Sequence, residues 1–163
     1  LDVGASTGGF SDCLLQAGAA RVAAVDVGHG QLHPRLRSDP RVTVLERTNA
    51  RELPLLPFAP SLVVCDVSFI SVRLALPPAL RAAAPGWEAV VLVKPQFEAG
   101  RADAPKGVVR DDAVRRRVVR EVAVAAVAWG AQTLGAVDSG VPGPKGNREL
   151  LLHLRDAPDA TPR

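Results

Sequence analysis

The chain has 163 residues, 47% of them hydrophobic and 23% charged, which is typical of a single domain that buries its own core without disulfides or a structural metal. No apolar stretch approaches the roughly 20 residues of a membrane-spanning helix, so we expect a soluble protein with no membrane partner. The net charge of +3 and the pI of about 9.4 permit an anionic partner but do not require one.

The two ends of the chain differ in character. The chain contains no methionine and opens on Leu1-Asp2-Val3, which looks like the middle of a strand. We therefore expect an N-terminally truncated domain that covers residues 1–155. Residues 156–163 are rich in Pro, Asp and Ala, and this composition predicts a disordered tail.

The cysteines follow no metal-ligand spacing. Cys13 and Cys65 both lie in apolar neighbourhoods of the sequence, which predicts two buried thiols rather than a metal site. Unpaired thiols of this kind favour the reducing cytoplasm as the location of the protein.

Short runs rich in β-branched residues alternate with amphipathic segments along the chain. Strands are predicted around residues 1–3, 21–25, 42–45, 62–65, 89–93, 132–137 and 149–154. Helices are predicted at residues 9–17, 71–84 and 111–129, and Pro34 limits any helix after Gly30 to a few turns. This alternation predicts an α/β fold with a doubly wound, mostly parallel sheet.

The segment 111–129 gives the clearest helical pattern. Its apolar stripe consists of Val114, Val118, Val122, Ala126 and Trp129. Its opposite face carries Arg115, Arg116, Arg117 and Arg120. We interpret this basic face as the solvated side of a surface helix in preference to an RNA contact.

Glycines and small residues follow the first predicted strand, where the chain turns into a helix. They are Gly4, Ala5, Ser6, Thr7, Gly8, Gly9 and Phe10. Ligands of α/β sheets bind at this edge, because glycine permits close approach and free amides at a helix start suit the polar end of a nucleoside cofactor. The spacing is not Gly-x-Gly-x-x-Gly and no Gly-Lys-Ser/Thr follows, which disfavours dinucleotide and P-loop sites.

Two further positions extend the expected cofactor site. Asp26 ends the second strand, where a carboxylate can accept hydrogen bonds from both ribose hydroxyls, and Val27 follows it. Asp26 could instead merely cap a turn. The spaced set is similar to that of class I methyltransferases, which implies S-adenosyl-L-methionine as the cofactor; it consists of Asp2, Gly4, Gly8, Gly9 and Asp26. Such proteins contact adenine just beyond the third strand, which implies this role for Asn49 and Ala50.

Three charged residues are expected to meet at the same edge of the sheet. Asp66 follows the fourth strand, Lys94 follows the fifth, and Glu149 starts the last strand, provided that this strand runs antiparallel. Asp66 and Lys94 could form an ordinary ion pair. However, the chain has 17 arginines and only 3 lysines, and arginine cannot give up its proton whereas lysine can. A lysine at this position therefore points to proton chemistry.

Five motifs together resemble the TlyA (haemolysin A) branch of the FtsJ-like ribose 2′-O-methyltransferases. They lie at residues 1–9, 47–51, 66–71, 94–100 and 146–149. The resemblance implies a Rossmann-like class I methyltransferase with a seven-stranded sheet whose last strand is antiparallel. It also implies 2′-O-methylation of cytidine in ribosomal RNA, and an S4-like RNA-binding domain upstream in the same protein.

The resemblance also assigns roles to the charged residues. The family uses a Lys-Asp-Lys-Glu set, whose last three members correspond to Asp66, Lys94 and Glu149, while the first lysine precedes the cofactor turn and is expected to lie ahead of Leu1. Lys94 is expected to act as the general base, held by the two carboxylates, with Asp66 also beside the cofactor. Phosphate contacts to ribosomal RNA or ribosomal subunits are expected from Arg101, Lys106, Arg110, Lys145 and Arg148.

Three other functions remain open at this level. A methyltransferase of the same fold could act on nitrogen of a base, a protein or a small molecule, but the Asn or Asp followed by Pro-Pro and an aromatic residue that base N-methylation usually requires is not found at Asp66-Val67-Ser68-Phe69. A haemolysin-like membrane-active protein would need a long apolar or strongly amphipathic segment. A non-catalytic RNA-binding protein would bind RNA without consuming the cofactor.

Overall fold

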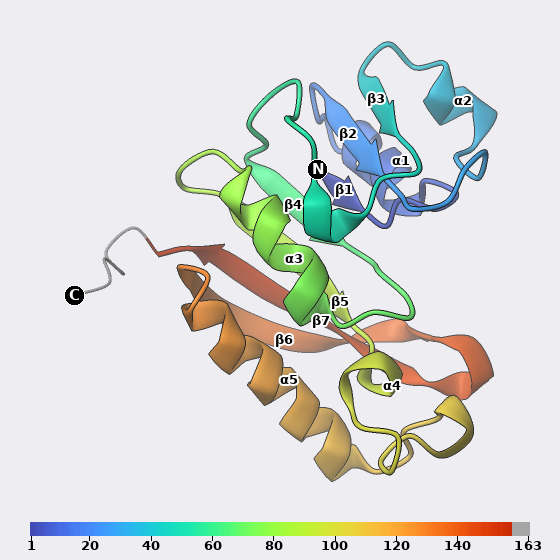
Figure 1. Cartoon of the computed structure of the whole chain (residues 1–163), viewed down its shortest axis with the longest axis vertical. Helices are drawn as coiled ribbons and strands as arrows, with labels where there is room; N and C mark the ends of the chain where they lie inside the picture. The colour runs from blue at the N-terminus through green and yellow to red at the C-terminus, as the bar shows by residue number, and fades with distance from the viewer. Residues whose placement is uncertain (158–163) are drawn as a thin grey trace.

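Seven strands and five helices make up the part of the chain that the computed structural model describes, residues 1–157 (Figure 1). The strands are β1 (Asp2–Val3), β2 (Val22–Val25), β3 (Val42–Leu45), β4 (Leu62–Cys65), β5 (Glu88–Val93), β6 (Ala131–Pro142) and β7 (Arg148–Asp156). The helices are α1 (Gly9–Gln16), α2 (Pro34–Arg37), α3 (Val72–Arg81), α4 (Pro95–Glu98) and α5 (Asp112–Val127). Short 3-10 turns occur at Ala50–Glu52, Pro105–Gly107 and Pro144–Gly146.

The strands form one sheet in the order β3-β2-β1-β4-β5-β7-β6. The pairs among β1 to β5 are parallel, and β7 runs antiparallel to both β5 and β6. The mostly parallel, seven-stranded sheet with an antiparallel last strand is therefore confirmed. The register pairs Val93 with Leu150, so β7 begins beside the end of β5, where the charged residues were expected.

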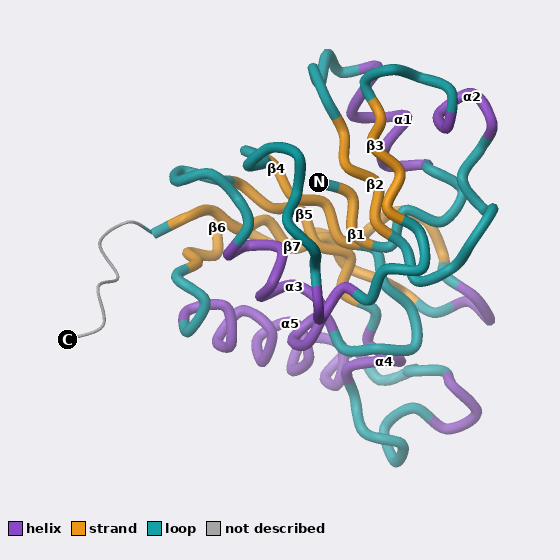
Figure 2. Tube along the Cα trace, turned by 45° about the horizontal axis from the view of Figure 1, so that its top comes forward, coloured by secondary structure: helices purple, strands orange, loops and turns teal. Residues whose placement is uncertain are grey.

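Helices cover both faces of the sheet, as a doubly wound fold requires. Figure 1 shows α3 and α5 in front of the sheet and α1 behind it, and Figure 2 shows α1 and α2 beside β2 and β3, apart from α5 near β6. Alternation along β2 explains the two layers, because Ala23 and Val25 join the large core while Val22 and Ala24 join the smaller cluster with Leu15 of α1.

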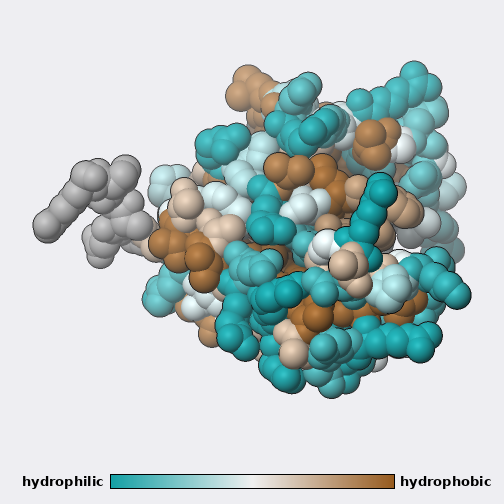
Figure 3. Space-filling view, turned by 60° about the horizontal axis from the view of Figure 1, so that its bottom comes forward, coloured by the Kyte–Doolittle hydropathy of each residue, from teal (hydrophilic) through white to brown (hydrophobic). Residues whose placement is uncertain are grey.

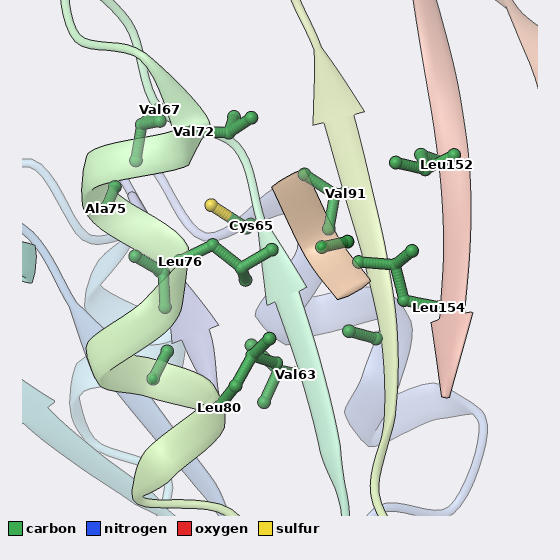
Figure 4. Packing of buried hydrophobic residues seen from close by; sticks show 14 of the residues in the cluster. Val63, Cys65, Val67, Val72, Ala75, Leu76, Leu80, Val91, Leu152 and Leu154 are labelled. Atoms are coloured by element: carbon green, nitrogen blue, oxygen red, sulfur yellow. The ribbon is translucent and has the colours of Figure 1, made fainter. Parts of the chain in front are cut away.

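The large core lies between α3, α5 and the centre of the sheet. Leu76 and Leu80 of α3 point toward Val63 and Cys65 of β4 (Figure 4), and Leu76, Val63 and Cys65 are completely buried. Burial of a leucine side chain of this kind stabilises a fold by about 1.5–3 kcal/mol. This packing holds the ends of β1, β4 and β5 in fixed positions relative to one another.

The long C-terminal helix matches its predicted stripe. Val118, Val122 and Ala126 of α5 are fully buried, and Val114 and Trp129 pack half-buried against the same core. Asp111 caps the helix, since its carboxylate accepts a hydrogen bond from the amide of Ala113 at 2.7 Å. These contacts confirm both the start of the helix and the face that it buries.

Two expectations about local structure need correction. Cys65 is buried but Cys13 is exposed, because α1 turns Ser11 and Leu15 inward and leaves Cys13 on its outer face. The strand β7 continues to Asp156, and the amide of Ala157 donates to the carbonyl of Gly130 at 2.8 Å. Asp156 and Ala157 are therefore ordered, contrary to the prediction for Asp156, and the rest of the predicted tail, residues 158–163, lies outside the described residues.

The surface mixes polar and apolar side chains. Figure 3, which brings the lower side of Figure 1 forward, shows separate hydrophobic patches among hydrophilic residues on that face. Within residues 1–157, no helix has the length and apolarity needed to cross a lipid bilayer.

Candidate functional site

A cleft of about 500 Å³ opens at the carboxyl edge of the sheet. Its lining comes from the segments that follow β1, β2, β3 and β4. These residues are Gly4, Ser6, Val25, Asp26, Val27, Gln31, Thr48, Asn49, Ala50, Arg51, Asp66, Val67, Ser68, Phe69 and Ile70. The cleft is thus located at the edge of the sheet where α/β proteins bind ligands, and its volume suits a nucleoside cofactor.

The turn after β1 is packed too closely for side chains at two positions. A Cβ atom on Gly4 would lie 2.1 Å from the carbonyl oxygen of Asp66, and one on Gly8 would lie 2.2 Å from Cδ1 of Leu36. Both glycines also have left-handed backbones, with φ of 83° and 101°, which other residues adopt at a cost. The glycines therefore let the turn lie directly against β4 on one side and α2 on the other.

Asp26 at the end of β2 is already hydrogen-bonded by the backbone. Its carboxylate accepts from the amide of Ser6 at 2.8 Å and from the amide of Gly28 at 2.7 Å. The second contact is the turn cap that the sequence left open as an alternative, yet Asp26 also lines the cleft. A carboxylate has about four lone-pair sites, so two remain for hydroxyl donors of a ligand.

The adenine end expected near Asn49 and Ala50 is also part of the cleft. Asn49 starts the 3-10 turn Ala50–Glu52, because its side-chain oxygen accepts from the amide of Arg51 at 3.1 Å. Val27 is an apolar side chain that is 76% exposed on the opposite wall. An exposed aliphatic face of this kind can cover one side of a flat base.

Some predicted cofactor residues do not line the cleft. They are Ala5, Thr7, Gly8, Gly9 and Phe10. Ala5 is buried in the smaller core, and the carbonyl of Thr7 accepts from the amide of His33 at 3.0 Å. These residues shape the turn and the start of α1 rather than the cleft wall.

Other lining residues were not predicted from the sequence. Val67, Ser68, Phe69 and Ile70 directly follow Asp66, and their closeness to a predicted site residue was the available signal. Gln31 lines the cleft from the loop after β2, where its side chain lies against Gly28. A side chain at position 28 would collide with Gln31. A local sequence pattern carries no signal for such a contact.

The structure brings Asp66 and Lys94 into contact at the lip of the cleft. Nζ of Lys94 lies 2.6 Å from Oδ1 of Asp66 and donates a hydrogen bond to Oγ of Ser68 at 2.9 Å. Because Oδ1 accepts no hydrogen bond of good geometry among residues 1–157, the Asp66 contact is an ion pair rather than a directed hydrogen bond. The Lys94 side chain is only 11% exposed, which places a cation in a partly dehydrated setting.

Glu149 lies next to this pair but bonds elsewhere. The last antiparallel pair of β5 and β7 joins Val93 to Leu150. Lys94 follows Val93 and Glu149 precedes Leu150, so both residues adjoin this pair. Glu149 is 5% exposed, and its Oε1 accepts from Nε2 of Gln96 at 2.8 Å. Within the described chain, no hydrogen bond or ion pair joins Glu149 to Lys94.

Further contacts also join the segment after β4 to the segment after β5. Buried Glu98 accepts hydrogen bonds from Oγ of Ser71 and from the amide of Val72, both at 2.6 Å. The rings of Phe69 and Phe97 lie 5.1 Å apart, while Phe69 stays 91% exposed and has a left-handed φ of 65°. A bulky residue in this conformation is strained, and here it presents an aromatic ring beside the cleft.

A buried carboxylate lies beneath the cofactor turn. Asp2 is fully buried, and Oγ of Ser11 donates to its Oδ2 at 2.7 Å, whereas its Oδ1 has no partner among the described residues. Burial raises the pKa of Asp2 above its usual value, and the hydrogen bonds from Ser11 oppose this rise. The folded chain therefore holds the proton of this group more tightly than the unfolded chain does.

We predict that Asp2→Asn stabilises the fold at neutral pH by on the order of 1–2 kcal/mol. Because the pKa of Asp2 is raised on folding, the charged form costs stability that is absent below the unfolded value near 3.8 and grows as pH rises above it. Urea unfolding at neutral pH and near pH 3 measures the difference, which should vanish in acid. Asp12→Asn, at an exposed carboxylate on α1, is the control; a loss of stability in Asp2→Asn at both pH values would contradict the prediction.

The expected phosphate-binding residues differ in their contacts. Arg101, Lys106, Arg110 and Lys145 are exposed, and Nζ of Lys145 donates to the carbonyl of Lys106 at 3.0 Å. Arg148 instead forms an ion pair with Asp138 at 2.7 Å. The two lysines therefore lie on neighbouring loops, while Arg148 is already neutralised by an acidic partner.

Buried Asn147 holds these two loops together. Its Nδ2 donates to the carbonyl of Gly107 at 2.9 Å and to that of Pro144 at 3.0 Å, and its Oδ1 accepts from the amide of Val109 at 3.1 Å. The turns Pro105–Gly107 and Pro144–Gly146 have the same Pro-Lys-Gly sequence, with φ of 56° and 59° at their lysines. The result is a pair of basic turns, each with an exposed lysine, that Asn147 holds side by side.

The lining of the cleft suits an organic cofactor. Between residues 1 and 157, no group of three His, Cys, Asp or Glu side chains could hold a metal ion. The cleft instead offers a turn without side chains at Gly4, the carboxylate of Asp26 and the apolar wall at Val27. These features fit S-adenosyl-L-methionine, whose nucleoside has two ribose hydroxyls and a flat base.

Comparison with known proteins gives consistent relatives. The chain is 50% identical over 162 residues to the 16S/23S rRNA (cytidine-2′-O)-methyltransferase TlyA of Mycobacterium tuberculosis, an alignment that covers 98% of this chain and 60% of that protein. The structure of a hemolysin-named protein from Streptococcus thermophilus superimposes with a TM-score of 0.93 and 44% identity, over 96% of this chain and 58% of the other. The chain thus spans about 60% of the length of the relatives that it matches.

More distant structures share the fold alone. An S-adenosylmethionine dependent methyltransferase from Listeria monocytogenes is 15% identical and superimposes with a TM-score of 0.70, over 95% of this chain and 89% of that one. The Rossmann-like class I methyltransferase fold is therefore confirmed. The model of the FtsJ-like methyltransferase family matches residues 1–156, almost the whole chain, and so the chain belongs to the FtsJ-like methyltransferase family.

Proposed function

We propose that this chain is the catalytic part of an S-adenosyl-L-methionine-dependent enzyme that methylates the ribose 2′-hydroxyl of cytidine in ribosomal RNA. The observation that carries the proposal is the contact between Lys94, Asp66 and Ser68 at the lip of the cofactor-sized cleft. The name of the M. tuberculosis relative supports the substrate and the methylated atom.

The cofactor would lie with its nucleoside between Asp26 and Asn49. Asp26 would accept from the ribose hydroxyls, Asn49 and Ala50 would meet the adenine, and Gly4 would let the methionine end approach Asp66. When bound, the cofactor supplies an electrophilic methyl group on a positively charged sulfur. The attraction of that charge for the carboxylate of Asp66 would help to orient the donor at the rim.

Lys94 would remove the proton of the ribose hydroxyl. The cofactor would supply the methyl group to the 2′-oxygen and leave in its demethylated form, while Nζ of Lys94 would accept the proton of the hydroxyl. Holding the hydroxyl in line for this step supplies much of the rate. Ser68 accepts a hydrogen bond from Nζ, which aims the amine.

The carboxylates around Lys94 oppose a base role, because a nearby negative charge favours the ammonium form. Two effects would counter them. Bound RNA would remove water from an amine that is already only 11% exposed, and the additional lysine that the family carries ahead of the cofactor turn would add a like charge. Activity is therefore expected from the full natural protein rather than from these 163 residues alone.

Phe69 would bind the target nucleotide next to this cluster. Its exposed ring lies three positions from Asp66 and borders the cleft, and single-stranded RNA bases are commonly recognised by stacking on aromatic side chains. A cytidine stacked on Phe69 would present its ribose to Lys94. The strained backbone conformation at Phe69 would then serve to present the ring to the base.

The proposal is tested with the full natural protein, radiolabelled S-adenosyl-L-methionine and unmodified ribosomal subunits. The label should appear on the ribose of a cytidine. Label on a base nitrogen or on protein would favour the nitrogen methyltransferase instead, and RNA binding without transfer would favour a non-catalytic role. Lysis of liposomes by the protein in the absence of cofactor would support the membrane-active alternative.

The proposal includes two partners. Ribosomal RNA would contact the exposed side chains of Arg101, Lys106, Arg110 and Lys145. An S4-like RNA-binding domain upstream in the natural protein would supply further contacts, consistent with the greater length of the relatives.

Binding to ribosomal RNA is expected to weaken steeply with salt, because each phosphate neutralised by a lysine releases a counterion. The double variant Lys106→Ala/Lys145→Ala should lower the slope of log affinity against log salt by about 1–2, as measured by filter binding across a salt series. Arg41→Ala, at an exposed ion pair with Asp39, is the matched control. A slope that is equal in both variants would show that the paired lysines do not contact phosphate.

A further inference from the structure

The carboxylate of Glu149 is enclosed by two neighbours from separate loops. Nε2 of Gln96, in the single turn of α4, donates to Oε1 at 2.8 Å. The backbone of Gly143, in the loop between β6 and β7, lies against the same oxygen. With 5% of its surface exposed, Glu149 has little freedom to choose another partner.

Gly143 is a glycine for reasons of space and not of backbone conformation. Its φ is −74°, a value that any residue can adopt. A Cβ atom at this position would lie 2.4 Å from Oε1 and 2.7 Å from Cδ of Glu149, well inside contact distance. The absent side chain is therefore what allows the carboxylate to lie where Gln96 can reach it.

The orientation of Gln96 follows from the chemistry of its partner. An ionised carboxylate only accepts hydrogen bonds, so the amide nitrogen of Gln96 must face Glu149 and the amide oxygen must face away. That oxygen, Oε1, is buried and has no donor among the described residues. An unpaired buried acceptor costs about 1–3 kcal/mol, so stability alone does not explain a glutamine at this position.

We propose that Gln96 is a positioning residue for methyl transfer, which rests on the function proposed above. Its amide holds Oε1 of Glu149 against Gly143 and thereby leaves Oε2 as the oxygen available to Lys94, two residues before Gln96 in the chain. Glu149, which adjoins the last β5–β7 pair of Val93 and Leu150, then acts on Lys94 from a fixed direction, while Asp66 contacts the amine from the β4 side. Without the side-chain amide of Gln96, the carboxylate of Glu149 can rotate. The amine of Lys94 then loses the second of the two carboxylates that fix its position.

Two substitutions at Gln96 separate positioning from simple packing. Gln96→Leu removes the donor while keeping similar volume. Gln96→Glu is nearly the same shape but places a second carboxylate against Glu149, where two close carboxylates cannot both ionise and must share a proton. A positioning role therefore predicts a new ionisation in the pH dependence of kcat for Gln96→Glu, which a packing role does not produce.

The experiment measures single-turnover methyl transfer by the full natural protein on unmodified ribosomal subunits between about pH 6 and pH 9. Gln96→Leu and Gly143→Ala should each lower kcat by about 10- to 100-fold, with KM for S-adenosyl-L-methionine nearly unchanged. Gln132→Leu is the matched control, because Gln132 pairs with Arg155 at the far edge of the sheet. If Gln96→Leu does not fold, the near-isosteric Gln96→Glu and the independent Gly143→Ala still decide the outcome.

A second readout does not depend on turnover. The ¹³C signal of the Glu149 carboxyl should move in Gln96→Leu and in Gly143→Ala and stay in place in Gln132→Leu. An active wild type whose kcat, pH profile and Glu149 signal are unaffected by these substitutions would overturn the role of Gln96 alone. A wild type that transfers no methyl group would overturn the proposed function, and the positioning role with it.

Discussion

Replacement of Lys94 by alanine should abolish methyl transfer, by at least about 1,000-fold, while leaving the affinity for S-adenosyl-L-methionine almost unchanged. Nζ of Lys94 contacts Asp66 and Ser68 at the lip of the cleft, but Lys94 is not among the residues that line it. Loss of the amine therefore removes the proton acceptor without removing a wall of the cofactor site. Single-turnover transfer and calorimetric cofactor binding measure the two effects separately.

Lys94→Arg distinguishes a base from a simple cation. A guanidinium keeps the positive charge and can still pair with Asp66, but it cannot release its proton to become a base. The arginine variant should be as inactive as the alanine variant. Substantial activity in Lys94→Arg would show that charge is sufficient, and full activity in Lys94→Ala would refute the assignment altogether. Arg41→Ala, at an exposed ion pair with Asp39, serves as the control for loss of a surface cation.

Replacement of Gly4 by alanine should remove cofactor binding and lower the free energy of unfolding by several kcal/mol, on the order of 2–4. The new Cβ would lie 2.1 Å from the carbonyl oxygen of Asp66, and the φ of 83° disfavours any side chain. Relief requires β1 and β4 to separate at the edge of the sheet that forms the cleft. Thermal unfolding and cofactor titration of the variant measure both losses.

Gly9→Ala provides a matched control only five positions away. Gly9 begins α1, and a Cβ atom added to it would meet no other atom within 4 Å, so alanine there should be neutral or stabilise by about 0.5–1 kcal/mol. A Gly4→Ala variant as stable as Gly9→Ala would contradict the close approach of the cofactor turn to β4.

The sequence was sufficient to predict most of the sheet and one wall of the site. Strands β3 and β4 have the predicted limits, and the buried stripe of α5 is the predicted one, because continuous apolar runs and a 3.6-residue period leave few alternatives. Asp26, Asn49 and Asp66 line the cleft as expected, since all three lie beyond the carboxyl ends of parallel strands, which meet at one edge. A sequence pattern therefore predicts the position of a residue best where the direction of the strands decides which residues meet.

Other features depend on contacts between distant segments and could not be predicted. The single turn of α4 is too short to show a helical period. The bond from Gln96 to Glu149 joins residues 53 positions apart, and its partner Gly143 gives no conformational signal because its φ is ordinary. Cys13 was expected inside because its neighbours are apolar, but only the angular position of a residue on α1 decides which side chains face the sheet.

The amides of Ser6 and Gly28 fix the carboxylate of Asp26 by hydrogen bonds from the chain itself. Under the proposed binding mode, the ribose would meet an acceptor whose direction is already set, and little ordering of loops would be required. After methyl transfer, the demethylated by-product still carries the same ribose and adenine and would find the same anchor intact. The proposed binding mode therefore predicts slow departure of that by-product, and consequently inhibition of further turnover as it accumulates.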